Sequence, residues 1–187
     1  MQDWEDSSTM VKRIVAIAVI LMGLCLQSCV SGTIGLRSYI DPTDGYEFVY
    51  PNGWVEITVP NGPDVVIHDI VDPSENISVI ISEVPDGKTL ADLGTPTDVG
   101  QRLAHRGLSA AGDRNAELVN AEAKESDIGP YYLLEYAVQL PGQVRHNLAS
   151  VVVRRGKLFT FNASTTEQRW SKMKEILRQA VQSFSVY

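Results

Sequence analysis

The chain has 187 residues, of which 44% are hydrophobic, and this length fits one domain with a single core. Its formal net charge is −7, so it lacks the overall basic surface that the phosphate backbone attracts, and we expect no nucleic-acid partner. Both cysteines, Cys25 and Cys29, lie near the N-terminus. The remaining sequence therefore excludes a disulfide, a cysteine-based zinc site and a thiol nucleophile.

The N-terminal segment has the pattern of a bacterial lipoprotein signal peptide. The basic pair Lys12-Arg13 precedes an apolar run from Ile14 to Leu26. A run of about a dozen residues suits a signal peptide and is shorter than the roughly 20 residues that span a bilayer. Leu26-Gln27-Ser28-Cys29 follows and is similar to a lipobox, which predicts cleavage before Cys29 and lipid attachment to it. The alternatives are an uncleaved anchor or a short core helix.

Three segments are expected along the chain. Residues 1–28 form the signal peptide, although the acidic first nine residues suggest that translation starts at Met10. Residues 29–37 are rich in Gly and Ser and predict a flexible tether. Residues 38–187 form one domain.

The domain opens with a predicted hairpin. Residues 46–50 alternate as a strand, and residues 54–59 are expected to return beside it. Pro51-Asn52-Gly53 is the expected turn, because Asn and Gly accept a positive φ.

Further elements follow from β-branched runs, alternation and turn residues. Thr97 or Asp98 is expected to cap a helix that runs to about Leu108. Strands are expected at residues 65–69, 76–84, 116–126 (with a helix as the second choice there), 131–140, 144–154 and 158–163.

The last element is the clearest helix. Thr165 and Gln168 predict a capping box at its start. Its apolar residues recur at spacings of three and four and predict one buried stripe: Trp170, Met173, Ile176, Leu177, Ala180, Val181 and Phe184. Hairpins combined with two helices predict an α+β domain with a mainly antiparallel central sheet.

Several of these segments together resemble the PsbP family, the lumenal extrinsic proteins of photosystem II. Asp44–Glu56 (DGYEFVYPNGWVE) resembles the opening hairpin of the family, Gly62–Asp69 and Glu75–Ser82 its next two strands, and Leu93–Gly100 its helix entry. The resemblance covers about residues 44–187, and with a lipobox in place of a transit peptide it is strongest for the cyanobacterial lipoprotein member. It implies an α-β-α sandwich.

No catalytic constellation is visible, so we expect the protein not to be an enzyme. A metal site is the first alternative, because His68 is followed by Asp69 and Asp72 at a strand end. Imidazole and carboxylates together can bind Zn or Mn, and the family resemblance adds Ca to these ions. The competing interpretation is a surface histidine.

Basic residues gather late in the chain. Arg145, Arg154, Arg155 and Lys157 fall around one predicted hairpin. In an acidic domain they are either a solvated face or a docking patch for an acidic partner surface.

The resemblance implies a monomeric accessory protein on the lumenal side of the thylakoid membrane, held there by its lipid. It would dock on photosystem II core subunits or assembly intermediates and assist the assembly or stability of the oxygen-evolving complex. The alternative is a Zn, Mn or Ca binding or delivery factor. An unrelated lipoprotein enzyme or ligand binder would require a concave pocket with converging polar groups.

Overall fold

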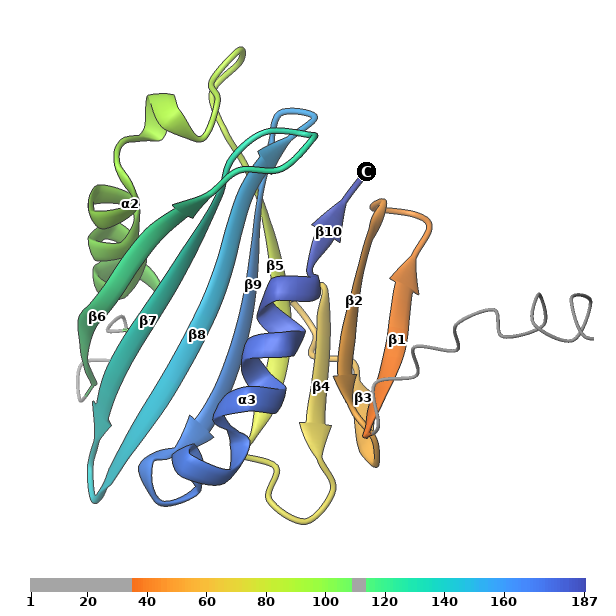
Figure 1. The fold of residues 1–187 in the computed structure, drawn as a ribbon, viewed down its shortest axis with the longest axis vertical. Coiled ribbons are helices and arrows are strands. Elements are labelled where there is room, and N and C mark those ends of the chain that lie inside the picture. Colours follow the sequence, from red (N-terminus) through yellow and green to blue (C-terminus); the bar gives the residue numbers. More distant parts are fainter. Residues whose placement is uncertain (1–34, 109–113) are drawn as a thin grey trace, which may run out of the picture. The chain divides into compact units, whose positions relative to one another are not determined.

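The computed structural model describes residues 35–108 and 114–187, so the signal peptide and Cys29 lie outside the described residues. A seven-stranded antiparallel sheet has the order β3-β4-β5-β9-β8-β7-β6, and a small antiparallel sheet has the order β1-β2-β10 (Figure 1). The strands are β1 (Leu36–Asp41), β2 (Tyr46–Pro51), β3 (Trp54–Ile57), β4 (Val65–Asp69), β5 (Asn76–Glu83), β6 (Asn115–Lys124), β7 (Tyr131–Leu140), β8 (Gln143–Arg154), β9 (Lys157–Thr166) and β10 (Ser185–Val186). The helices are η1 (Ala91–Leu93), α2 (Pro96–Leu103), the π-helical turn η2 (Ala104–Leu108) and α3 (Glu167–Ser183).

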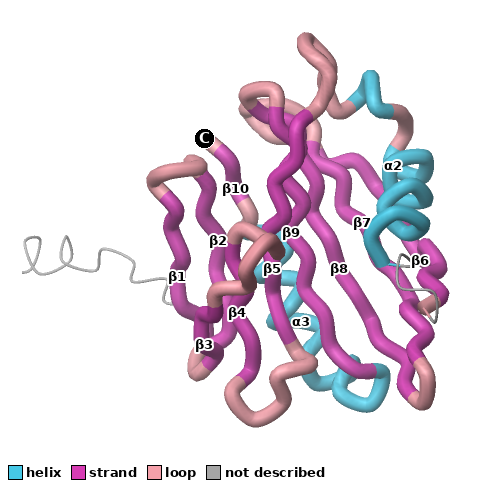
Figure 2. Tube along the Cα trace, turned by 180° about the vertical axis from the view of Figure 1, so that it is seen from behind, coloured by secondary structure: helices cyan, strands magenta, loops and turns pink. Residues whose placement is uncertain are grey.

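The two longer helices cover opposite faces of the large sheet (Figures 1 and 2). Strand β7 shows how alternation divides its side chains between two cores. Tyr131 and Leu133 belong to the core that α3 covers, whereas Tyr132 and Leu134 belong to the core that α2 covers. The predicted α+β class and α-β-α sandwich with a mainly antiparallel central sheet are therefore confirmed.

The predicted opening hairpin is wrong. Strand β2 pairs with β1 and β10, whereas β3 pairs with β4 in the other sheet. Residues 51–53 thus carry the chain from one sheet to the other. The periodicity identified two strands correctly, but strand pairing depends on which partner is available, and β1 supplies that partner. Its first residues, Leu36 and Arg37, were predicted as the end of the tether.

Helix α2 begins two residues earlier than predicted. The side chain of Thr95, not that of Thr97, accepts a hydrogen bond from the backbone N–H of Asp98, and the Asp98 carboxylate accepts from the backbone N–H of Thr95. This capping box is followed by close packing on the sheet. A Cβ on Gly100 would lie 2.9 Å from Leu118, so glycine permits the helix to approach β6.

Helix α3 carries the predicted apolar stripe but not the predicted capping box. Five residues of the stripe are buried: Met173, Leu177, Ala180, Val181 and Phe184. They cover an aromatic cluster in which the Phe48 and Phe161 rings lie 4.9 Å apart. Thr166 is the residue before the helix and makes no side-chain cap, because β9 extends three residues further than expected and buries Thr165.

Candidate functional site

The predicted metal ligands His68, Asp69 and Asp72 lie where β4 leads into the loop before β5. The Asp69 carboxylate accepts hydrogen bonds from the backbone N–H groups of Val71 and Asp72, at 2.6 and 3.0 Å. Although burial raises its pKa, these bonds lower it more, so the pKa of Asp69 lies below its ordinary value. The Asp72 carboxylate accepts from the backbone and hydroxyl of Ser74. Both carboxylates therefore already brace this loop.

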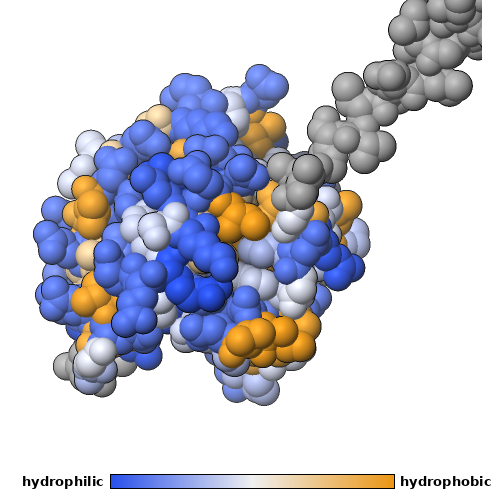
Figure 3. All heavy atoms as spheres, turned by 60° about the horizontal axis from the view of Figure 1, so that its bottom comes forward, coloured by the Kyte–Doolittle hydropathy of each residue, from blue (hydrophilic) through white to orange (hydrophobic). Residues whose placement is uncertain are grey.

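The same loop exposes two aliphatic side chains. Ile70 is 66% exposed and Val71 is 88% exposed. We call residues 69–75 the apolar loop. This loop lies at the lower end of the domain in Figure 1. Figure 3 shows that end as a mostly hydrophilic surface with separate hydrophobic patches. Sequence reasoning missed it, although an Ile-Val pair between two aspartates in a turn was the available signal. A braced loop with exposed apolar side chains is suited to contact another surface.

The donor atoms of His68, Asp69 and Asp72 do not converge into a cluster that could hold an ion. Within residues 35–108 and 114–187, the grouped donors are instead Asp41, Asp44 and Asp64. These carboxylates also have protein partners, since Lys157 lies 3.2 Å from Asp44, and the Tyr46 hydroxyl donates to Asp64 at 2.6 Å. The metal prediction for His68, Asp69 and Asp72 stays a prediction.

The predicted docking residues Arg154, Arg155 and Lys157 gather at the end of the β8–β9 hairpin, at the upper end of Figure 1. We call these three residues the basic end. Arg155 is exposed and donates to the main-chain oxygens of Asp44 and Tyr187. Arg154 makes one long hydrogen bond, 3.4 Å, to the Ile128 carbonyl.

Arg145 does not belong to this group, and here the predicted docking patch is corrected. It lies near the start of β8, nine residues from Arg154, which is about 30 Å along a strand. Its side chain is buried, with 8% of its surface exposed. The sequence spacing suggested one hairpin, but the length of β8 separates Arg145 from the hairpin end.

His146 is partly buried on β8. Its ring stacks on Trp170 with centroids 4.4 Å apart, and its Nε2 contacts the carboxylate of Glu167. His105 is exposed on the π-helical turn.

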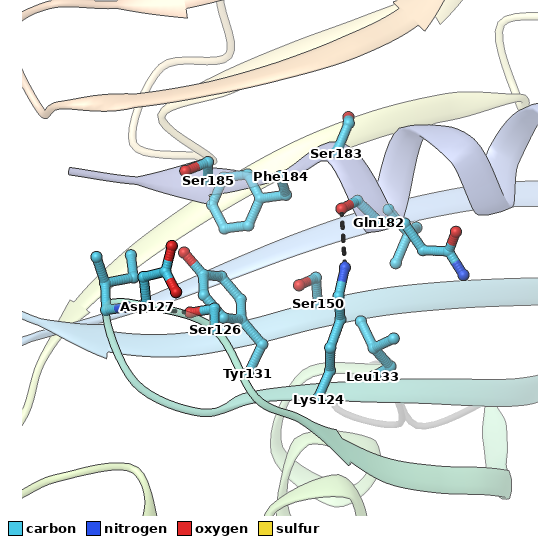
Figure 4. A pocket seen from close by; sticks show the side chains of 12 residues that line it. Lys124, Ser126, Asp127, Tyr131, Leu133, Ser150, Gln182, Ser183, Phe184 and Ser185 are labelled. Carbon is cyan, nitrogen blue, oxygen red and sulfur yellow. Dashed lines mark hydrogen bonds between the residues drawn. The ribbon is translucent and has the colours of Figure 1, made fainter.

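A cavity of about 290 Å³ lies where the last turn of α3 meets β7 (Figure 4). Lys124 extends across it and donates to the Gln182 carbonyl at 3.5 Å. Tyr131 and Leu133 form part of its wall. These groups supply no nucleophile paired with a base, so the cavity offers no evident catalytic chemistry.

Among the described residues, none of the helices is long and apolar enough to cross a membrane.

Comparison with known proteins assigns the family. The PsbP family model matches residues 34–186. CyanoP of Synechocystis sp. is 47% identical over 188 residues, which covers 95% of this chain and 100% of the relative. CyanoP of Thermosynechococcus vestitus is 44% identical and covers 92% of this chain and 95% of the relative.

A solved structure agrees with these sequence relatives. The solution structure of CyanoP from Synechocystis sp. PCC 6803 superposes with a TM-score of 0.72 and 51% identity, over 86% of this chain and 98% of that chain. The crystal structure of LpqN from Mycobacterium tuberculosis, at 14% identity and a TM-score of 0.52, shares the fold alone. The chain therefore belongs to the PsbP family of photosystem II accessory proteins.

Proposed function

We propose that this protein is a lipid-anchored accessory factor on the lumenal side of the thylakoid membrane. It docks on photosystem II core subunits or assembly intermediates and assists the assembly or stability of the oxygen-evolving complex. The observation that carries this proposal is the similarity to two CyanoP proteins over more than nine-tenths of this chain. The role is one of binding and not of catalysis.

The lipid on Cys29 would confine the domain to the membrane surface. A mature lipoprotein cysteine carries several acyl chains, which give stable anchoring where a single chain gives only marginal binding. Confinement raises the local concentration of the domain near a membrane partner. The variant Cys29→Ser should remain unprocessed or be released, and wild-type partitioning of this variant into membranes would contradict the anchor.

Two surfaces at opposite ends of the domain are candidates for docking. The basic end presents the exposed positive charge of Arg155, which favours an acidic partner surface. The apolar loop offers Ile70 and Val71, braced by Asp69 and Asp72, so little conformational entropy would be lost on contact. Both features are suited to a protein partner, and mutation can separate them.

The test is a pull-down of the tagged protein from solubilised thylakoid membranes, with the captured chains identified by mass. We expect photosystem II core subunits, enriched for incomplete complexes. Arg154→Glu tests the basic end, with Arg106→Glu as a matched exposed control on the π-helical turn. Val71→Ser tests the apolar loop, with Ile40→Ser as a control, because Ile40 is also exposed, at 59%.

Loss of capture in one test variant, with both controls unchanged, would identify the docking surface. Capture that contains no photosystem II subunit with the wild-type protein would contradict the proposed function itself. Equal losses in the test and control variants would contradict both candidate surfaces.

A further inference from the structure

Another cavity lies on the face of the large sheet that α2 partly covers. Its volume is about 380 Å³, and it is lined by residues of β5, β7, β8 and β9 together with Ser74 and Arg114. The described residues that line it include two arginines, three asparagines and two serines, and none carries a carboxylate. We call it the Arg145 cavity. Its lining is therefore positively charged and rich in hydrogen-bond donors.

Arg145 is the unusual member of this lining, because buried arginines are normally paired with an acid. It is 8% exposed, and no ion pair among the described residues includes it. Its Nε and Nη2 donate to the Ser164 hydroxyl at 3.1 and 2.7 Å, and Nη2 also donates to the Ser74 carbonyl. These partners are neutral oxygens, so the guanidinium keeps its positive charge beside the cavity.

Burial and the neighbouring charges have opposing effects on the pKa of Arg145. Burial lowers the pKa of its guanidinium below the ordinary value, and the nearby positive charge of Arg114 lowers it further. The carboxylates of Asp72 and Glu75 raise this pKa, each by more than Arg114 lowers it, although neither forms an ion pair with Arg145. An anion bound near Arg114 and Arg145 would offset the cost of burying the Arg145 charge and the repulsion between the two guanidinium groups.

Hydrogen bonds along the cavity floor all run in one direction. Ser164 accepts from Arg145 and donates to the side-chain oxygen of Asn147 at 3.0 Å. Asn147 in turn donates to the side-chain oxygen of Asn162 at 3.2 Å. Each acceptor in the row is thus used by its neighbour. Among the described residues, Nη1 of Arg145 and the side-chain N–H groups of Asn162 have no hydrogen-bond acceptor.

We propose that the Arg145 cavity binds an oxyanion, the phosphate or sulfate group of a soluble ion or of a lipid headgroup. Arg114 and Arg145 supply the charge, and the Asn162 amide supplies a neutral donor. Guanidinium groups suit such ligands, because charge-assisted hydrogen bonds to oxyanions are stronger than neutral ones. The cavity volume is in the range of known small-ligand sites.

The experiment is titration calorimetry on the full chain in an uncharged detergent, with two classes of probe. Inorganic phosphate and sulfate test the free ion, and short-chain phosphatidylglycerol, compared with short-chain phosphatidylcholine, tests the headgroup. Saturable binding of at least one anionic probe is expected. The side-chain amide signals of Asn147 and Asn162 should shift in its NMR titration.

Two variants test the site without removing the buried Arg145. Arg114→Glu and Asn162→Asp each introduce a negative charge into the lining, and each should weaken binding at least tenfold. Lys172→Glu makes the same charge change as Arg114→Glu on an exposed position of α3 and should leave the affinity within about twofold. Unchanged thermal unfolding midpoints would show that the variants are folded.

Specific outcomes decide the proposal and the source of the ligand. Tighter binding of phosphatidylglycerol than of phosphate would identify a lipid headgroup, and the reverse would identify a soluble oxyanion. Absence of saturable binding would overturn the proposal. Binding that Arg114→Glu and Asn162→Asp leave unchanged would indicate an adventitious ion only and would also overturn it. Because no photosystem is present, the result is independent of the pull-down.

Discussion

The carboxylate of Glu75 is fully buried and accepts a hydrogen bond from Nε of Arg169 at 2.6 Å. Thr165 donates to the same carboxylate oxygen. Glu75 ends the apolar loop, and Arg169 lies in the first turn of α3. This contact therefore joins the loop to the helix that covers one core.

Removing Arg169 should be strongly destabilising, because it would leave the Glu75 carboxylate buried without its charged partner. We expect Arg169→Met to lower the free energy of unfolding by about 3 kcal/mol, measured by chemical denaturation. Lys172→Met, an exposed cation on the same helix, should cost less than about 0.5 kcal/mol. The double variant Glu75→Gln, Arg169→Met should regain part of the loss. Equal effects of the two single variants would contradict a stabilising pair.

Asp69 should contribute stability that depends on pH. The pKa of its carboxyl is lower in the folded protein than its ordinary value of 3.8. A carboxyl group whose pKa is lower in the folded than in the unfolded protein stabilises the fold when the pH is above its unfolded-state pKa. This stabilisation disappears as the pH falls through its folded-state pKa. The wild type should be more stable than Asp69→Asn at pH 7, and the difference should shrink toward pH 3. A difference that does not vary with pH would contradict this role.

The two threonines at the start of α2 provide a matched pair. Thr95 makes the cap, whereas Thr97, one of the two predicted capping residues, lies two residues further on and is exposed. Thr95→Ala should lower the free energy of unfolding by about 1 kcal/mol, because it removes a capping hydrogen bond. Thr97→Ala should change it by less than about 0.5 kcal/mol. Denaturation curves that rank the variants in the opposite order would show that the cap is assigned to the wrong residue.

The metal hypothesis predicts saturable Zn²⁺ or Mn²⁺ binding that depends on His68. Calorimetry should show this binding in the wild type and lose it in His68→Ala, with His105→Ala, an exposed histidine elsewhere, as the control. Coordination by Asp69 would also compete with its two backbone hydrogen bonds, so the metal should perturb the Val71 and Asp72 amides. Binding that survives in His68→Ala would contradict this ligand set and direct attention to Asp41, Asp44 and Asp64.

Much of the fold was predictable because its signals are local. Alternation in β7 assigned Tyr132, Leu134 and Tyr136 to one face, and all three lie in the core beneath α2. The three-and-four spacing of α3 likewise predicted the stripe that contains Met173 and Leu177. Hydrophobic periodicity depends only on neighbouring residues, so the sequence contains it directly.

The sequence by itself determined the elements, their buried faces and the resemblance to the family. The tertiary structure alone decided which elements meet. It paired β2 with β1 instead of β3, and it used Thr165 to bond Glu75 instead of capping α3. It also separated Arg145 from the basic end and enclosed it beside Asn147 and Ser164. Such contacts join residues that are far apart in the chain. Their energies depend on burial and on the partners that folding brings together, and a local sequence pattern contains neither.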